Sequence, residues 1–215
     1  MTYLELVNSV MRKLREDTVS TVDQNAYSRL IGEFVNDAKR YCEDAWDWSA
    51  LRTTLTAVTE VGVFNYALTD SGQRIKVFRV VDDTNNRFLQ QQTAHWMSNA
   101  YLANTAPSGQ PGYYTFNGID TNGDTLVDIY PIPDAAYELR FETVKRTERF
   151  TTDTEKLTIP SDPVIQWAFS YALRERGETG GQSAPEQIIF AKEALSDAIA
   201  LDAQKTPDET IWYYA

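Results

Sequence analysis

The sequence has one cysteine and one histidine among its 215 residues, and it has no apolar run of about 20 residues. A single cysteine excludes an intrachain disulfide, and a single histidine excludes a histidine-based metal cluster. The missing apolar run predicts no membrane-spanning segment. The first residues also lack the cationic start and apolar core of a signal peptide. These absences favour a protein that is made and folded in the cytoplasm and has no membrane partner.

The short motifs of common catalytic sites are missing too. The sequence contains no GxSxG turn, no GxGxxG or GxxxxGK[ST] phosphate loop and no HExxH metal motif. The lone histidine, His95, belongs to no catalytic pattern, so a surface or packing role is expected. The 31 acidic residues allow many carboxylate pairs of the kind that cleave glycosides, but abundance identifies none of them. We therefore expect no catalytic residues and no cofactor.

The charge balance is acidic, with a formal net charge of −11 at pH 7. An acidic surface repels phosphate backbones and anionic membranes, so a basic patch that binds nucleic acid is not expected. DNA can still pass beside such a surface, because repulsion keeps it from adhering. The basic residues at 12–15 and 145–149 have acidic neighbours, which indicates solvated or intersubunit faces.

Four segments repeat apolar residues at three- and four-residue spacing, as amphipathic helices do. They are residues 3–15, residues 25–52, a segment that begins near Ser161 and a segment that ends near Gln204. Cys42 lies in the apolar stripe of the second segment, so a buried thiol is expected. Thr21 and Gln24 have the spacing of a capping box ahead of that helix.

Between these helices the pattern changes to that of strands. From about Thr53 to Arg146, stretches rich in β-branched and aromatic residues alternate with turn signals, and Arg74–Asp82 is a clear strand among them. Thr93–Leu102 is expected to form a short helix. The segment Asn104–Gly112 has the composition of a loop.

The predicted fold class is therefore α+β. A four-helix bundle is expected from the N- and C-terminal helix pairs, with an inserted antiparallel β-rich lobe and an extended C-terminal tail. The expected domains are residues 1–52 with 160–205 for the bundle, residues 53–159 for the lobe and residues 206–215 for the docking tail.

The segment Asp120–Asp128 partly matches a calcium-binding loop. Positions one, three, five and nine of the loop are Asp120, Asn122, Asp124 and Asp128. The match fails at position six, Thr125, where glycine is needed, and at position twelve, where Pro131 replaces glutamate. An Asn-Gly pair between strands is typical of a hairpin. A hairpin turn is therefore expected, with a calcium site as the alternative.

The C-terminal tail ends in a group of large side chains: Ile211, Trp212, Tyr213 and Tyr214. These residues would form an exposed apolar patch if nothing covered them. Tryptophan and tyrosine are also favoured anchors of protein interfaces. The tail is expected to dock on another chain, and folding back on its own helices is the alternative.

Three parts of the chain share the pattern of a known family. The first is TYLELVNSVMRKLRE with the long helix and its exit DWSALR. The second is QPGYYTFNG followed by TLVDIYPIPDAAYELRFETVKR, and the third is the closing helix pair with its tail. In this order the three parts resemble the head-to-tail adaptor family of tailed bacteriophages, which includes podophage tail tubular protein A.

The resemblance implies a structural virion protein and no enzyme. Proteins of that family form a ring, commonly a dodecamer, beneath the portal of the capsid, where they extend the DNA channel and seat the tail nozzle or fibres. The implied partners are the portal protein, nozzle or fibre proteins, further copies of the chain, and genomic DNA that passes without sequence-specific binding. The resemblance places Ile211–Tyr214 at the portal contact and the protein in the neck of the virion, after assembly in the host cytoplasm.

Two other classes of function stay open at this point. One is a phage-associated cell-wall glycosidase that uses a pair of the many carboxylates. The other is a monomeric calcium- or carbohydrate-binding module built on the β-rich lobe.

Overall fold

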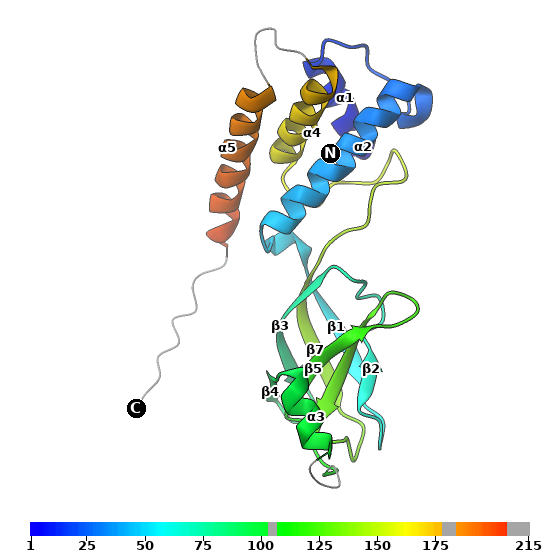
Figure 1. Ribbon diagram of the computed structural model, residues 1–215, viewed down its shortest axis with the longest axis vertical. Coiled ribbons are helices and arrows are strands. Elements are labelled where there is room, and N and C mark those ends of the chain that lie inside the picture. The colour runs from blue at the N-terminus through cyan, green and yellow to red at the C-terminus, as the bar shows by residue number, and fades with distance from the viewer. Residues whose placement is uncertain (103–106, 178–183, 206–215) are drawn as a thin grey trace. The chain divides into compact units, whose positions relative to one another are not determined.

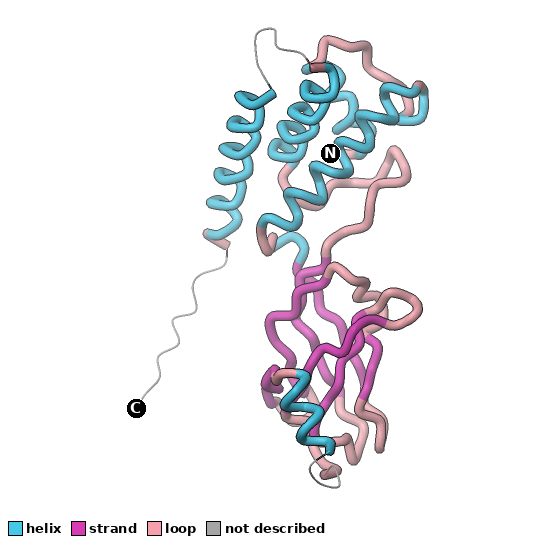
Figure 2. Tube along the Cα trace, in the orientation of Figure 1, coloured by secondary structure: helices cyan, strands magenta, loops and turns pink. Residues whose placement is uncertain are grey.

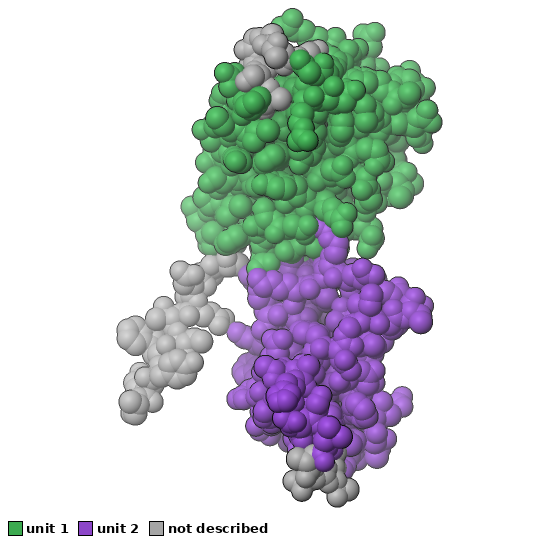
Figure 3. Space-filling model, in the orientation of Figure 1, with its two compact units in different colours: residues 1–51, 146–215 green, residues 52–145 purple. Residues whose placement is uncertain are grey.

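The computed structural model describes residues 1–102, 107–177 and 184–205 of the chain. The chain divides into two compact units (Figure 3). Unit 1 consists of Met1–Leu51 and Arg146–Ala215, and unit 2 consists of Arg52–Lys145. Unit 2 is thus inserted once between the two halves of unit 1.

Unit 1 is helical (Figures 1 and 2). Its α-helices are α1 (Tyr3–Lys13), α2 (Ala26–Ala45), α4 (Ser161–Arg176) and α5 (Ala184–Ala203), and short 3-10 turns span Val22–Gln24 and Ser49–Leu51. None of the described helices is both long and apolar enough to cross a membrane.

The start and the end of α2 differ from the prediction. The predicted capping box at Thr21 and Gln24 does not form, and the box lies at Asn25 and Ser28 instead. The Asn25 side chain accepts a hydrogen bond from the Ser28 amide at 2.7 Å, which satisfies a free donor of the first turn. The helix ends at Ala45 because Trp46 adopts an extended backbone, with φ −150° and ψ 154°. The continuous helix predicted up to Arg52 is therefore wrong.

Three of the helices of unit 1 pack on one another. Helices α1, α2 and α4 share contacts, whereas α5 packs mainly on α4. The fully buried side chains of this core are Leu6, Val7, Val10, Ile31, Val35, Ala38, Cys42, Val164, Ala168 and Ala172. The predicted burial of the Cys42 thiol is confirmed.

The predicted four-helix bundle is wrong. A four-helix bundle requires four helices that all face one shared core, but α5 packs mainly against α4. The largest regular layer of the molecule is a seven-stranded sheet in unit 2, which carries its own hydrophobic core. The fold is α+β, and the sheet dominates its core.

The strands of unit 2 follow the order β1-β7-β3-β4-β5-β6-β2. They are β1 (Arg52–Val58), β2 (Asn65–Ala67), β3 (Ile75–Asp82), β4 (Arg87–Gln91), β5 (Tyr113–Ile119), β6 (Thr125–Tyr130) and β7 (Glu138–Lys145). Helix α3 (Ala94–Leu102) connects β4 to β5, which run parallel, and the other neighbours are antiparallel. The sheet is therefore mixed, and the purely antiparallel lobe that was predicted is wrong.

One face of the sheet holds the core of unit 2. Its buried side chains are Leu68, Val80, Leu89, Tyr114, Val127, Ile129, Leu139 and Phe141. Successive residues of a strand point to opposite faces, so the neighbours of these residues in β3, β4 and β7 form a second face. The register of β3 against β7 shifts between Val77 and Arg79, which makes Phe78 the extra residue of a bulge. The predicted strand at Arg74–Asp82 and helix at Thr93–Leu102 are confirmed.

Candidate docking surfaces

The polar side chains that could carry chemistry are scattered in the structure. Within the described ranges, no three or more His, Cys, Asp and Glu side chains are grouped so that they could hold a metal ion. His95 is exposed on α3, where its Nε2 lies 3.1 Å from the Asn99 amide nitrogen. Burial, with a smaller contribution from Glu43, raises the pKa of the Cys42 thiol to about 12, so this thiol is protonated at neutral pH. Neither side chain is set up as a nucleophile or a base.

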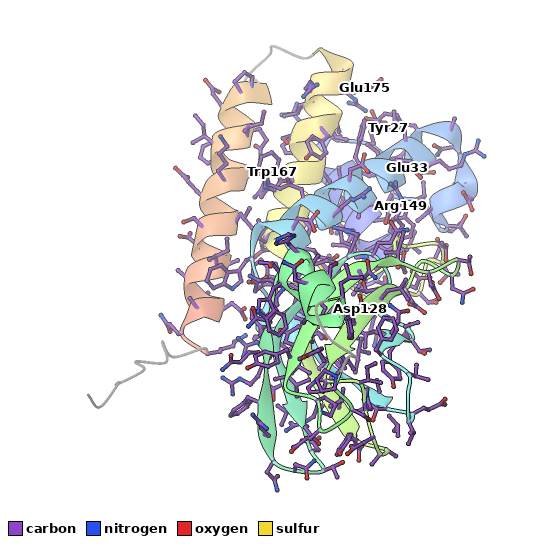
Figure 4. The ribbon with its side chains drawn as sticks, turned by 60° about the horizontal axis from the view of Figure 1, so that its bottom comes forward. Tyr27, Glu33, Asp128, Arg149, Trp167 and Glu175 are labelled. Atoms are coloured by element: carbon purple, nitrogen blue, oxygen red, sulfur yellow. The ribbon has the colours of Figure 1, made fainter. Side chains whose placement is uncertain are left out.

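The carboxylates of the Asp120–Asp128 segment are engaged in separate hydrogen bonds. Asp120 accepts from the amides of Asn122 and Asp124, both at 2.8 Å, and closes the turn. Asp124 accepts from the Gly72 amide at 3.0 Å, and this bond lowers the pKa of Asp124 below its ordinary value. Asp128 lies on β6, where Figure 4 labels it, and it accepts hydrogen bonds from the side-chain amides of Asn65 and Asn117.

The predicted hairpin turn is confirmed, because β5 and β6 pair on either side of this segment. The calcium alternative for Asp120, Asn122, Asp124 and Asp128 stays a prediction. The second set of predicted site residues, Ile211, Trp212, Tyr213 and Tyr214, lies outside the described residues, and its docking role also stays a prediction.

The basic residues at 146–149 are paired inside unit 1. Arg146 lies 3.5 Å from an Asp44 oxygen and 3.3 Å from an Asp47 oxygen. Arg149 pairs with Glu33, and Figure 4 shows these two side chains beside each other. These cations therefore neutralise acids of α2 and its exit, and they hold the segment after β7 against that helix.

We call the second face of β1, β7, β3 and β4 the outer sheet face, and it carries two exposed phenylalanines. Arg79 and Glu142 are cross-strand partners. Both side chains lie on the outer sheet face, because their neighbours Val80 and Phe141 point into the core. Phe78 is 46% exposed and Phe88 is 60% exposed. Exposed large apolar side chains that gather on one face are typical of interaction surfaces.

Cations lie over both of these rings. The Arg52 guanidinium and the Lys76 ammonium lie 5.9 Å and 5.1 Å from the centroid of Phe78. The Arg79 guanidinium lies 5.2 Å from the centroid of Phe88. Cations at such distances are attracted by the ring faces. The outer sheet face is thus both aromatic and cationic, in a chain whose net charge is −11.

A second exposed surface lies on α5. Its buried line consists of Gln187, Ala191, Leu195, Ala198 and Asp202. Phe190, Ala194, Asp197 and Leu201 form another line at helical spacing. Phe190 is 49% exposed and Leu201 is 66% exposed. Glu186 and Glu193 flank this second line, which we call the α5 outer face. It is apolar and acidic.

A groove lies beside the α5 outer face. It has a volume of about 530 Å³ and is lined by residues of α1, α4 and α5, which include Phe169, Phe190, Glu193, Ala194 and Asp197. The exposed Phe190 ring and the acids of α5 therefore border an open groove in unit 1.

The C-terminal end of α5 is fixed by its one buried carboxylate. Asp202 accepts hydrogen bonds from the Ser49 amide at 2.8 Å, from the Ser49 hydroxyl at 2.6 Å and from the Trp46 indole at 3.2 Å. Burial by itself would raise the pKa of Asp202. The hydrogen bonds from Ser49 and the nearby Lys205 outweigh it and hold the pKa below its ordinary value. These bonds set the orientation in which α5 presents its outer face.

Helix α3 carries a cluster of aromatic rings. The ring centroid of Trp96 lies 5.0 Å from that of Tyr113 and 5.5 Å from that of Tyr130, which it meets edge to face. Tyr101 lies between Tyr130 and Phe64. Residues 84–119, which contain α3, carry one formally charged side chain, that of Arg87. Aromatic enrichment with few charges is the composition of protein interface cores.

The sequence patterns did not single out the outer sheet face or the α5 outer face. Phe78 is outward only because of the β3 bulge, and Phe88 is outward only because of its register with Val81. The apolar residues of α5 were assigned to one stripe, although they surround much of the helix. A helix with more apolar residues than one buried stripe needs indicates a second, exposed apolar surface, and this surplus could have predicted the α5 outer face.

The family model described as SU10 adaptor protein matches residues 1–210. A search of curated proteins finds no match to the chain.

Proposed function

Because the chain belongs to the SU10 adaptor protein family, we propose that it is a head-to-tail adaptor that assembles as a ring beneath the portal of a phage capsid. Family membership makes the chain a structural adaptor component of a phage virion. The ring, a dodecamer by resemblance to tail tubular proteins, would continue the DNA channel below the capsid. The match over residues 1–210 is the single observation that carries this proposal.

Two further observations support a role in assembly. Large apolar side chains are exposed on two separate surfaces, the outer sheet face and the α5 outer face. A protein that acts by holding neighbours needs such surfaces, and a chain that works alone rarely exposes them in groups. The net charge of −11 suits a channel wall that DNA passes without adhering.

The proposed partners follow from this placement. The tail residues Ile211, Trp212, Tyr213 and Tyr214 contact the portal protein on one side. Nozzle or fibre proteins dock on the other side, and genomic DNA passes through the ring without sequence-specific contacts. The protein is assembled in the host cytoplasm and stays in the neck of the virion.

The portal contact is tested by co-sedimentation of the full chain with the portal protein of the same phage. We expect the full chain to sediment with the portal, and we expect the loss of binding when residues 206–215 are removed. A matched variant keeps Ile211–Tyr214 and replaces Pro207, Asp208 and Glu209 by serine, and it should still bind. Binding by the truncated chain would refute the tail assignment, and no binding by the full chain would refute the adaptor proposal.

A further inference from the structure

We propose that the outer sheet face of one copy binds the α5 outer face of a neighbouring copy. This inference rests on the proposed self-assembly and names the two surfaces that would carry it. Neither surface belongs to the tail or to the predicted portal contact.

The two surfaces match in their apolar content. Phe78 and Phe88 stand exposed on the sheet, and Phe190 and Leu201 stand exposed on the helix. Burying these side chains against the other surface removes apolar area from water, which favours association. The groove between α4 and α5 offers room beside Phe190 for a ring from the partner.

The charged side chains that surround the exposed apolar residues have opposite signs on the two surfaces. Arg52, Lys76 and Arg79 lie on the sheet surface, where each contacts the face of Phe78 or Phe88. Glu186, Glu193 and Asp197 lie on the exposed side of α5. Opposite charges that surround apolar contacts give an interface its register and exclude wrong partners. The complementarity lies between two surfaces of the same chain, and this is why we assign the contact to a second copy.

The dimensions of the surfaces agree as well. A helix of 20 residues such as α5 is about 30 Å long. A strand of eight residues such as β3 is about 26 Å long. One α5 can therefore lie along the strands and cover the outer sheet face over most of its length.

A contact between two different surfaces repeats from copy to copy. Each copy offers one outer sheet face and one α5 outer face, so the contact is heterologous. Heterologous contacts produce a ring when the rotation between copies closes. This is the kind of contact that the proposed ring requires.

Nucleic acid is the other occupant that cations beside exposed rings can attract. The outer sheet face also carries acids, because Glu142 lies 4.0 Å from Arg79 and Asp83 lies 2.9 Å from Arg140. Carboxylates within the face oppose a phosphate backbone but suit a partner of mixed charge. The observations therefore favour a protein surface.

The occupant is identified by photo-crosslinking in purified virions. A photo-reactive phenylalanine analogue replaces Phe88, and the matched control carries it at Phe64, an exposed ring outside the outer sheet face. On illumination we expect a product of two joined chains, in which the peptide joined to position 88 comes from α5. The Phe64 control should give no α5 product.

Charge reversal tests the same contact independently. The pair Lys76→Glu and Arg79→Glu should lower the amount of chain in virions about tenfold, and so should the pair Glu193→Lys and Asp197→Lys. Virions that carry all four changes should recover most of the chain, because attraction is restored with the signs exchanged. Failure of this recovery, with both pairs folded as judged by circular dichroism, would contradict the inference.

The remaining outcomes separate the inference from the proposed function. If the chain is present in several copies per virion but Phe88 joins to DNA, to another protein or within its own chain, the proposed contact is wrong and the adaptor role stands. If the chain is absent from virions, the adaptor proposal fails and the inference fails with it.

Discussion

At the scale of single residues, a buried ion pair secures the segment that follows β7. Lys39 and Glu43 lie one turn apart on α2, with their charged atoms 3.7 Å apart and their side chains 4% and 0% exposed. Glu43 accepts a hydrogen bond from the Thr147 amide at 3.2 Å. The Lys39 ammonium donates to the Glu148 carbonyl and lies 4.5 Å from the ring centroid of Phe150.

We expect Lys39→Met to lower the free energy of unfolding by about 3 kcal/mol, because it leaves the Glu43 carboxylate buried without its cation. The measurement is urea denaturation followed by helical circular dichroism. The control is Arg40→Met, which changes the next residue on the exposed side of α2 and should cost less than about 0.5 kcal/mol. Equal losses for the two variants would show that the buried pair adds nothing.

The carboxylate of Asp202 predicts a dependence on pH. Its pKa is held below the ordinary value of about 3.9, so its stabilising effect is complete above that value and is lost as the pH falls through the lowered pKa. We expect Asp202→Asn to lower the free energy of unfolding by about 2 kcal/mol at neutral pH. The reason is that a neutral side-chain amide accepts weaker hydrogen bonds than the charged carboxylate does.

The same variant should also lose less stability than the natural chain between about pH 4 and pH 2. Urea midpoints across this range measure the difference. Parallel pH profiles for the two proteins would contradict the role assigned to the ionised carboxylate.

At the scale of elements, α1 and α2 meet closely at one glycine. A Cβ at Gly32 would lie 2.3 Å from the Tyr3 hydroxyl oxygen and 2.9 Å from Val22 Cγ1. Burial raises the pKa of that tyrosine to about 12, which agrees with a hydroxyl enclosed between the helices. Only glycine lets the ring of Tyr3 lie against the backbone of α2.

We expect Gly32→Ala to destabilise unit 1 by about 1–3 kcal/mol through overpacking, although alanine is the better helix former. Adding Tyr3→Phe removes the nearest atom and should recover part of this loss. A double-mutant cycle measured by urea denaturation gives the coupling. A stabilised Gly32→Ala variant would show that α1 moves freely on α2.

The β5–β6 hairpin makes a prediction about calcium. The Asp120 and Asp124 carboxylates already accept backbone amides of this turn and of Gly72, so a metal ion would compete with these bonds for the carboxylate oxygens. We expect no saturable heat when calcium is titrated into the full chain in a calorimeter. Saturable heat that disappears in Asp124→Asn would establish the calcium site instead.

The elements that the sequence predicted correctly are those with local signals. Strand β3 alternates, α3 has one apolar side, and Asn122-Gly123 marks the β5–β6 turn. The predicted end of α2 was wrong because Trp46 and Trp48 continue the helical spacing of apolar residues beyond the true end of the helix. Trp48 is buried for another reason, since its indole donates to the Cys42 carbonyl at 2.8 Å and folds back over the helix end.

Features that depend on contacts between residues far apart in the chain could not be predicted from the sequence. The four-helix bundle failed because periodicity shows that a helix has an apolar stripe but not which helix covers it. Likewise, nothing local shows that β4 and β5 run parallel. The exposure of Phe78 and Phe88 depends on the bulge and the register of β3, so the outer sheet face appears only in the folded chain.

At the scale of the whole molecule, the described residues present several separate candidate contact surfaces. The outer sheet face and the α5 outer face expose large apolar side chains, and the aromatic cluster of α3 exposes Trp96 and Phe64. The outer sheet face is cationic and aromatic, the α5 outer face is acidic and apolar, and the cluster of α3 is neutral and aromatic. These different compositions suit different neighbours. A chain with several distinct contact surfaces is what an adaptor between larger assemblies requires.

Electron cryo-microscopy of the virion neck tests the proposed adaptor ring most directly. We expect a closed ring of copies of this chain beneath the portal, around the DNA path. A neck in which the portal meets the tail without this chain, or a chain bound there as a single copy, would contradict it.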